Sequence, residues 1–325
     1  MSPLFHRAGV GTTVALAMIL ATAPANAQLA PPALTEAAVG ALLAHGPWPR
    51  PLLLDPTNNL SGNANAAALG QSLFFDARLS PSGRAACSSC HRPEKAFADP
   101  PRRLSRGVAL TRRNTPSLLD VRLNATFGWK GSNPTLWQQT IRPIVDRDEM
   151  GSSAEHIRAH ISADARLAAR FRIVTGVDAA SSSPNEALVA AAKSIAAYQE
   201  TITSGITAFD RWRDTLAAGG MTAASSYPAT AQRGAVWFAT SAGCSACHSG
   251  PAFSDGRLHS ISRRGRTRDP IRTPPLRNVS HTAPYLHDGR AVSLLAAIRS
   301  HDDGLRLSET QAADIVSFLR TLDAR

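Results

Sequence analysis

Apolar residues recur at helical spacing in several separate stretches of the chain. In one of them, Leu188, Ala192 and Ile195 are three or four positions apart, which places them on one face of an α-helix. The same pattern appears on both sides of the middle of the chain. It predicts an all-α protein with helices over residues 64–75, 152–171, 185–202, 230–240 and from Ser308 onwards.

Two of these helices also carry a start signal. Ser152 with Glu155 and Ser308 with Gln311 have the spacing of a capping box, in which the two side chains satisfy backbone N–H groups of the first turn. Residues 296–304, AAIRSHDDG, indicate the end of a helix that runs into a turn.

The length of 325 residues exceeds that of most single domains, so two domains are expected. Residues 215–228, TLAAGGMTAASSYP, are rich in Gly, Ala and Ser, which suits a linker. We therefore expect one helical domain over 28–214 and a second over 229–325. Most prolines and arginines fall between the predicted helices, which indicates long loops.

The first 27 residues predict a signal peptide. They have a basic start with Arg7, an apolar run, and small residues at Ala25 and Ala27 where a signal peptidase would cut. The apolar run is short for a membrane span, although an uncleaved anchor is the alternative. We expect export, to a bacterial periplasm, with no membrane attachment.

The chain is strongly basic, with a formal net charge of +11, and the predicted signal contributes only Arg7 to it. In an exported protein, this charge favours an acidic macromolecular partner. Nucleic acid is not expected as a partner, because export removes the opportunity and no aromatic and basic binding motif is present.

All four cysteines lie in two motifs, CSSCH at 87–91 and CSACH at 244–248. C-x-x-C-H is the attachment pattern of c-type haem, in which two thiols bond to the haem and the histidine binds its iron. A zinc site or a pair of redox disulfides are the alternatives. The motifs predict two covalently bound haem c groups, attached through Cys87, Cys90, Cys244 and Cys247, with His91 and His248 as iron ligands, and hence two cytochrome c-like domains.

The order of segments resembles the bacterial di-haem cytochrome c peroxidase and MauG family. The resemblance rests on FFDARLSPSGRAACSSCH at 74–91, RNTPSLL at 113–119, W-x-G at 129–131, DEMG at 148–151, CSACHSGPAFSD at 244–255 and PPLRNVSHTAPYLHDGR at 274–290. It implies that the first haem reacts with hydrogen peroxide and that the second stores or relays an oxidising equivalent.

Several further roles follow from the resemblance. Glu149 and Gln139 match the acid and amide of the peroxide pocket, and Pro143 matches its wall. A carboxylate over open iron can move a proton from one peroxide oxygen to the other. Trp129 matches a tryptophan between the two haems, where an indole can pass electrons, although it could also be a packing residue.

The resemblance also implies one calcium ion between the haems. Its ligands would be Asn114, Thr282 and Pro284, the last two through backbone carbonyls, with water completing the shell; oxygen donors suit Ca²⁺. In one respect the chain departs from the family. It has WKGS where W-D-G-R is common, so Lys130 and Ser132 leave any ion pair there in doubt.

The ligand on the second haem distinguishes types within the family. The usual position lies fourteen residues after His287, and it holds methionine in peroxidases and tyrosine in MauG; here it is His301. No methionine follows the second motif, and Leu294, Ile298 and His301 share a helix face. We expect bis-histidine ligation by His248 and His301, the alternative being a core or helix-capping histidine.

In classical peroxidases of the family, a removable histidine from the loop after the first motif commonly covers the reactive haem. No histidine lies between His91 and His156, so the resemblance implies that the first haem is open to peroxide. These features predict an enzyme that uses peroxide to form a high-valent di-haem state, which oxidises a residue of a partner protein. Within the family they are most similar to the methanobactin-associated MauG-like enzymes (MbnH), which convert a partner's tryptophan to kynurenine. Trp212 is either an exit point for electrons or a packing residue.

Two alternatives stay open at this point. One is a peroxide-scavenging cytochrome c peroxidase that is fed by a small redox protein. The other is a di-haem electron carrier, for which Glu149 and Gln139 would have no purpose.

Overall fold

A computed structural model of the chain describes Met1 and residues 33–99, 107–111, 113–220, 226–260, 269–301 and 307–324. The predicted signal peptide, Met1 apart, and residues 221–225 of the predicted linker lie outside these ranges. The fold is predominantly helical, as expected. None of the helices in the described part has the length and apolar character that crossing a membrane requires.

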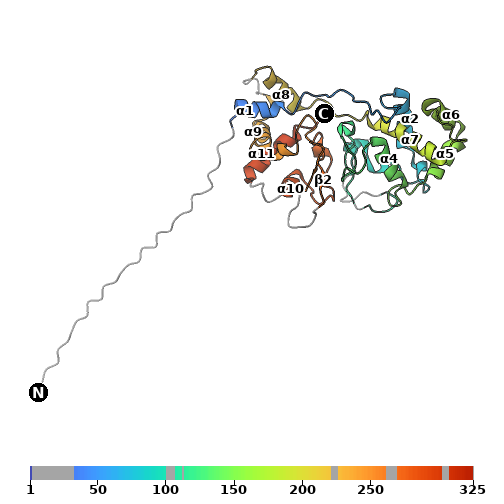
Figure 1. The fold of residues 1–325 in the computed structure, drawn as a ribbon. Helices are drawn as coiled ribbons and strands as arrows, with labels where there is room; N and C mark the ends of the chain where they lie inside the picture. Colours follow the sequence, from blue (N-terminus) through green and yellow to red (C-terminus); the bar gives the residue numbers. More distant parts are fainter. Residues whose placement is uncertain are drawn as a thin grey trace. The chain divides into compact units, whose positions relative to one another are not determined.

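One group of helices packs around a core that lies next to the first C-x-x-C-H motif (Figure 1). The group consists of α2 (Ala64–Phe74), α4 (Leu136–Val145), α5 (Ala154–Ala163), α6 (Ala165–Thr175) and α7 (Pro184–Gln199). The central helix is α7, which contacts α2, α4 and α5. The short helix α3 (Cys87–Cys90) carries the first cysteine pair.

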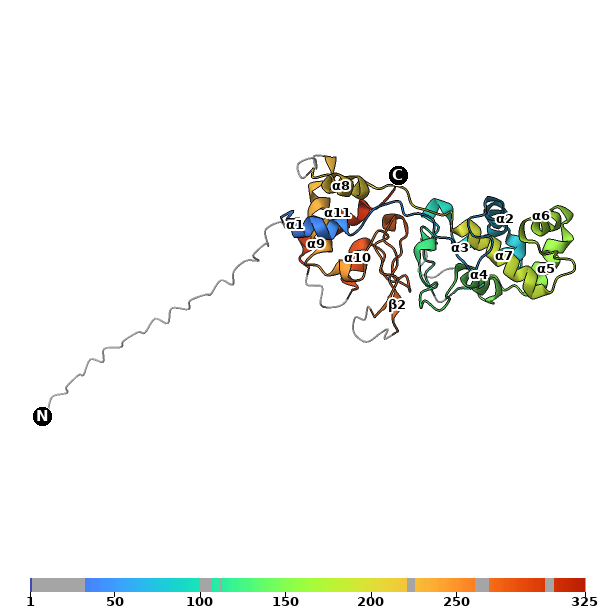
Figure 2. The ribbon, with the colours of Figure 1, turned by 45° about the horizontal axis from the view of Figure 1, so that its top comes forward.

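A second group packs around the core that contains the second motif (Figure 2). It consists of α1 (Glu36–Leu43), α8 (Ala208–Ala217), α9 (Ala229–Ala239), α10 (Leu294–Arg299) and α11 (Glu309–Arg320), with an antiparallel pair of short strands, β1 (Leu258–His259) and β2 (Ile271–Arg272). Helix α1 lies within the predicted first domain and α8 crosses the predicted boundary at 214, yet both pack in this second core. The domain bounds at 214 and 229 stay a prediction.

Several single turns of 3₁₀-helix connect these elements. They are η1 (Ala77–Leu79), η2 (Pro93–Lys95), η3 (Val121–Leu123), η5 (Cys244–Ala246) and η6 (Val279–His281).

Helix ends agree with the sequence pattern in some places and differ in others. The capping box of Ser308 and Gln311 is present at the start of α11. The predicted box at Ser152 is wrong, because Ser153 caps α5 instead, through a hydrogen bond from His156 N to its Oγ. The predicted helix over 152–171 is two helices, since Asp164 leaves helical geometry and caps α6 with its own carboxylate.

Two glycines allow helices to approach closely. A Cβ on Gly70 of α2 would collide with the Ser194 carbonyl of α7, and one on Gly234 of α9 would collide with the Asp314 carbonyl of α11. In each pair, the second helix presents backbone, which cannot move aside as a side chain could. These contacts set the spacing of the helices that precede the two haem motifs.

We therefore expect Gly234→Ala to destabilise the protein by about 1–3 kcal/mol, the usual cost of overpacking a core. The control is Gly40→Ala, at an exposed position of helix α1, where a Cβ meets nothing within 4 Å. There, alanine should stabilise the helix by roughly 0.5–1 kcal/mol. Chemical unfolding of the holoprotein measures both, and equal effects would contradict close packing of α9 on α11.

Candidate functional site

One continuous cavity brings together every site residue that the sequence indicates. Its lining includes both cysteine pairs and their histidines, His301, and the residues assigned to the peroxide pocket. These residues come from elements that are far apart in the chain. They are Cys87, Cys90, His91, Asn114, Trp129, Gln139, Pro143, Glu149, Cys244, Cys247, His248, Thr282, Pro284 and His301.

The imidazole of His91 is held in the orientation that a metal ligand needs. Its Nδ1 lies 3.0 Å from the carbonyl oxygen of Phe97. A carbonyl can only accept, so Nδ1 carries the proton and Nε2 keeps a free lone pair. Burial lowers the pKa of His91 to about 4, which keeps the ring neutral.

The second motif repeats this arrangement. The Nδ1 of His248 donates to the carbonyl of Phe253 over 3.0 Å, and burial lowers the pKa of His248 to about 4. Phe97 and Phe253 both have a positive φ, 56° and 55°, which lets each loop fold back over its motif. Both motifs therefore present a neutral histidine with a free Nε2 to the cavity.

His301 faces His248 across the cavity. Helix α10 ends at Arg299, so His301 follows the helix rather than lying on its face, and its Nδ1 contacts the Ala297 carbonyl at 2.8 Å. The two ring centroids are 6.3 Å apart. Metal–imidazole bonds of about 2 Å on each side place two opposed rings roughly 6 Å apart, so the observed spacing fits one iron between them.

The zinc alternative lacks such support. Among the described residues, no three His, Cys, Asp or Glu side chains converge on a site of metal-ion size. None of the four cysteines is in a disulfide, and they line the cavity in two separate pairs.

Gln139, Pro143 and Glu149 come from α4 and the turn that follows it. Gln139 and Pro143 are one helical turn apart and line the cavity together. Asn133, which the sequence did not indicate, donates its Nδ2 to Gln139 Oε1 over 2.7 Å and fixes that amide. Glu149 is held through its backbone carbonyl, which accepts from Val108 N at 2.7 Å.

The carboxyl group of Glu149 has an unusual environment. Burial, and then the negative charge of Asp146, raise its pKa above the ordinary value for glutamate. Among the described residues that line the cavity, it is the sole carboxylate. A carboxyl with a raised pKa accepts and returns a proton more readily near neutral pH than an exposed one does.

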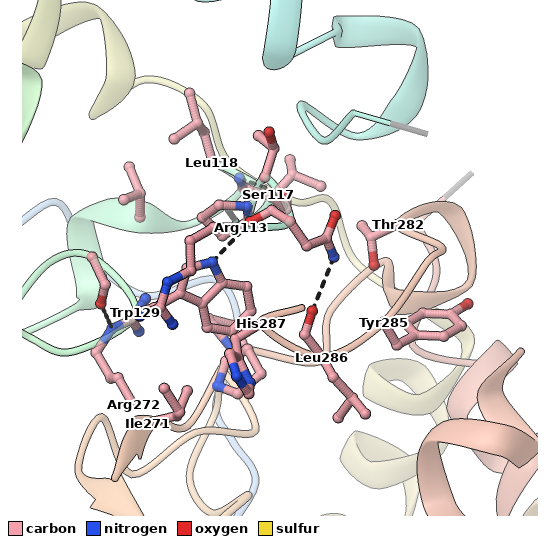
Figure 3. Close-up of a pocket in the computed structure, with 18 of the residues that line it drawn as sticks. Arg113, Ser117, Leu118, Trp129, Ile271, Arg272, Thr282, Tyr285, Leu286 and His287 are labelled. Carbon is pink, nitrogen blue, oxygen red and sulfur yellow. Dashed lines mark hydrogen bonds between the residues drawn. The ribbon is translucent and has the colours of Figure 1, made fainter. Parts of the chain in front are cut away.

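Trp129 lies where the first and second halves of the chain meet (Figure 3). Its Nε1 donates to the Asn114 carbonyl over 2.8 Å, and its own carbonyl accepts from Arg272 N on β2. Its ring packs edge-on against His287, with centroids 6.3 Å apart. Sequence reasoning did not assign His287, whose buried Nδ1 has no hydrogen-bond partner in the described part of the chain.

Two of the residues proposed for calcium, Asn114 and Pro284, are in contact. Asn114 Nδ2 contacts the Pro284 carbonyl at 2.6 Å and the Leu286 carbonyl at 3.2 Å, although 170 residues separate Asn114 from Pro284. Thr282 lines the same cavity. A cation there requires the amide of Asn114 to turn its oxygen toward these carbonyls, because the N–H groups of Nδ2 are donors and cannot bind a metal ion.

The role of Trp212 and the ion-pair partner of Lys130 were left open by the sequence, and the contacts of each residue bear on them. Trp212 is 4% exposed and stacks on Tyr227, with ring centroids 4.4 Å apart, which favours a packing role. Lys130 forms an ion pair with Asp269 at 2.6 Å in place of a pair within W-D-G-R. Both partners are exposed, so this pair contributes little to stability.

Comparison with known proteins identifies the family. The family model for di-haem cytochrome c peroxidase matches residues 64–217. MauG, a methylamine utilization protein of Methylorubrum extorquens, is 33% identical over 288 residues, which are 79% of this chain and 78% of that protein. Cytochrome c551 peroxidase of Nitrosomonas europaea is 28% identical over 286 residues, with 80% of each chain covered.

Solved structures agree with this result. A MauG-like protein associated with microbial copper homeostasis has a TM-score of 0.71 and 25% identity over 86% of this chain and 95% of its own. The di-haem peroxidase BthA of Burkholderia thailandensis has the same fold, with a TM-score of 0.69 and 21% identity over 84% and 87%. The chain therefore belongs to the di-haem cytochrome c peroxidase and MauG family and is a di-haem oxidoreductase of the peroxidase type.

Proposed function

We propose that this protein is an exported, periplasmic MauG-like enzyme that uses hydrogen peroxide to oxidise a residue of a partner protein. The observation that carries the proposal is the pair of opposed imidazoles, His248 and His301, at 6.3 Å. Two imidazoles give an iron a lower potential than histidine with methionine. Such a haem is a poor electron acceptor from a high-potential cytochrome and is better suited to sharing oxidising equivalents.

The haem attached at Cys87 and Cys90 would hold its iron on His91 and, when bound, supplies the site at which the O–O bond is cleaved. The chain's own residues manage the protons there. Glu149 takes the proton from one oxygen of peroxide and delivers it to the other oxygen, which leaves as water when the O–O bond breaks. Gln139, fixed by Asn133, orients the peroxide, and Pro143 limits the room for water.

Trp129 would connect the two haems electronically. Its indole is fixed on one side by Asn114 and its backbone on the other by β2. A rigid aromatic ring between two redox centres shortens the steps that an electron must take. The same contacts place Asn114 against Pro284, so we propose that one Ca²⁺, bound by Asn114, Thr282 and Pro284 with water, stabilises this junction.

A narrower proposal concerns the substrate. By the resemblance to the methanobactin-associated MauG-like enzymes, the oxidised residue would be a tryptophan of an acidic partner protein and the product kynurenine. A MauG-like protein associated with microbial copper homeostasis is among the solved structures similar to this chain. The net charge of +11 favours an acidic partner. The second candidate function is peroxide scavenging fed by a small redox protein, which the similarity to cytochrome c551 peroxidase of Nitrosomonas europaea favours.

One experiment separates these functions. Peroxide is added to the diferric holoprotein with a candidate acidic partner or with a reduced small cytochrome, and partner mass and cytochrome oxidation are followed. We expect a mass change in the partner and slow oxidation of the cytochrome. Rapid cytochrome oxidation without partner modification would establish the scavenger instead. Metal analysis of the same preparation should give two irons and one calcium per chain.

A further inference from the structure

The cavity that holds the haems has an excess of positive charge. Four arginines line it, Arg113, Arg142, Arg272 and Arg277, against the single described carboxylate Glu149. Two of the four have acidic neighbours. Arg277 forms a buried ion pair with Asp210 at 2.8 Å. The positive charge of Arg142 lowers the pKa of Glu149, in opposition to burial and to Asp146.

Arg272 differs from these, because it is buried without an acidic partner. Arg272 is 6% exposed. Its Nη1 donates to Asn124 Oδ1 at 3.0 Å and its Nε donates to the Gly128 carbonyl at 3.3 Å. These acceptors are neutral, and no ion pair joins Arg272 to any carboxylate in the described ranges. Burial alone lowers the pKa of Arg272 to about 10.

A guanidinium in this position requires a counter-ion. Removing an unpaired charge from water is strongly unfavourable, even after the surroundings relax. Carbonyl and amide oxygens satisfy N–H groups but do not cancel a charge. Arginine has five N–H donors in a fork that matches a carboxylate, and Nη2 has no partner among the described residues.

The anions that this cavity must accommodate are the carboxylates of the haems themselves. We propose that Arg272 is the counter-ion and hydrogen-bond donor of a haem propionate. The inference rests on haem occupancy of the cavity and goes beyond the assignment of the iron ligands. Glu149 is not available as the anion that pairs with Arg272, since its carboxylate serves the peroxide pocket.

The proposed contact between Arg272 and a haem propionate has a second consequence, which follows from where Arg272 lies. Its side chain holds Asn124 and Gly128, and its backbone N–H binds the carbonyl of Trp129 over 2.8 Å (Figure 3). One residue of β2 therefore holds both the loop that carries Trp129 and, by this proposal, a carboxylate of the cofactor. Arg272 is a positioning residue for the haem nearest this loop.

The test is a spectroelectrochemical titration of both haems in Arg272→Gln. A propionate charge favours ferric over ferrous iron, and a cation beside it cancels that preference. Loss of the cation should therefore lower the midpoint potential of one haem and leave the other unchanged. Glutamine Nε2 takes the place of arginine Nε and keeps a donor for the Gly128 carbonyl. The control is Arg257→Gln, which removes the same charge from an exposed position whose carbonyl binds Thr273 N and should shift neither potential.

Arg272→Lys keeps the proposal testable if the glutamine variant does not fold. At neutral pH its potentials should match those of the wild type. As alkaline pH deprotonates the buried amine, one potential should fall, whereas that of the wild type stays level. Unchanged potentials in Arg272→Gln, or a level alkaline titration in Arg272→Lys, would overturn the proposal. Neither measurement uses peroxide or a partner, and a preparation with fewer than two haems would contradict the cofactor assignment instead.

Discussion

Replacing His301 with alanine should convert the second haem from low-spin to high-spin ferric iron. His301 is held by its Nδ1 contact with the Ala297 carbonyl, and its ring lies 6.3 Å from that of His248. Removing one imidazole of an opposed pair leaves the iron with a single strong axial ligand, which favours the high-spin state. Electron paramagnetic resonance of the ferric protein should show complete loss of the low-spin signal.

His259→Ala is the matched control for this prediction. His259 lines the same cavity, but its Nε2 pairs with Asp255 at 2.7 Å and is not free to bind iron. That variant should keep the wild-type spectrum. His301→Met should restore six-coordination at a higher potential. If His301→Ala keeps its low-spin signal, the ligand assignment is wrong.

Replacing Glu149 with glutamine should slow the reaction with peroxide by about 10²–10⁴-fold, the usual contribution of a general acid–base group. Glutamine preserves the shape of the side chain but cannot accept the first proton. The base is the deprotonated carboxylate, so the wild-type rate should fall as pH drops through the pKa of Glu149. Since burial and Asp146 raise that pKa, the fall should begin at a higher pH than for an exposed glutamate.

Stopped-flow measurement of peroxide reaction against pH checks both parts. Asp148→Asn is the control, because it removes a charge from the neighbouring half-exposed residue. Asp148 helps to raise the pKa of Glu149, so this variant should keep its maximal rate and lose activity only at lower pH. Equal losses in the two variants would show that Glu149 acts through charge alone and does not carry the proton.

The haem motifs were predictable from sequence because covalent attachment demands a fixed local spacing. Cys87, Cys90 and His91 all lie within residues 87–91, and no distant residue is needed to recognise them. The prediction for His301 combined position with periodicity. The ring of His301 lies opposite that of His248, but the helix ends at Arg299, so the turn after the helix, and not the helix face, orients the ring.

Residues that act through tertiary contacts have no such fixed spacing in the sequence. Arg272 is one of many arginines in the chain, and its burial follows from the meeting of β2 with the loop at 124–129. Asn133 matters because it bonds to Gln139. Neither feature has a characteristic spacing. The choice between Ser152 and Ser153 as the cap of α5 depended on one residue of register, which local propensity does not resolve.

By these assignments, one cavity would hold two haems of unlike coordination, one open and one closed by two histidines. Electron paramagnetic resonance of the diferric wild-type protein tests it most directly. We expect one high-spin signal from the haem on His91 and one low-spin signal from the haem between His248 and His301, in equal amounts. Two low-spin haems, or two high-spin haems, would contradict the account.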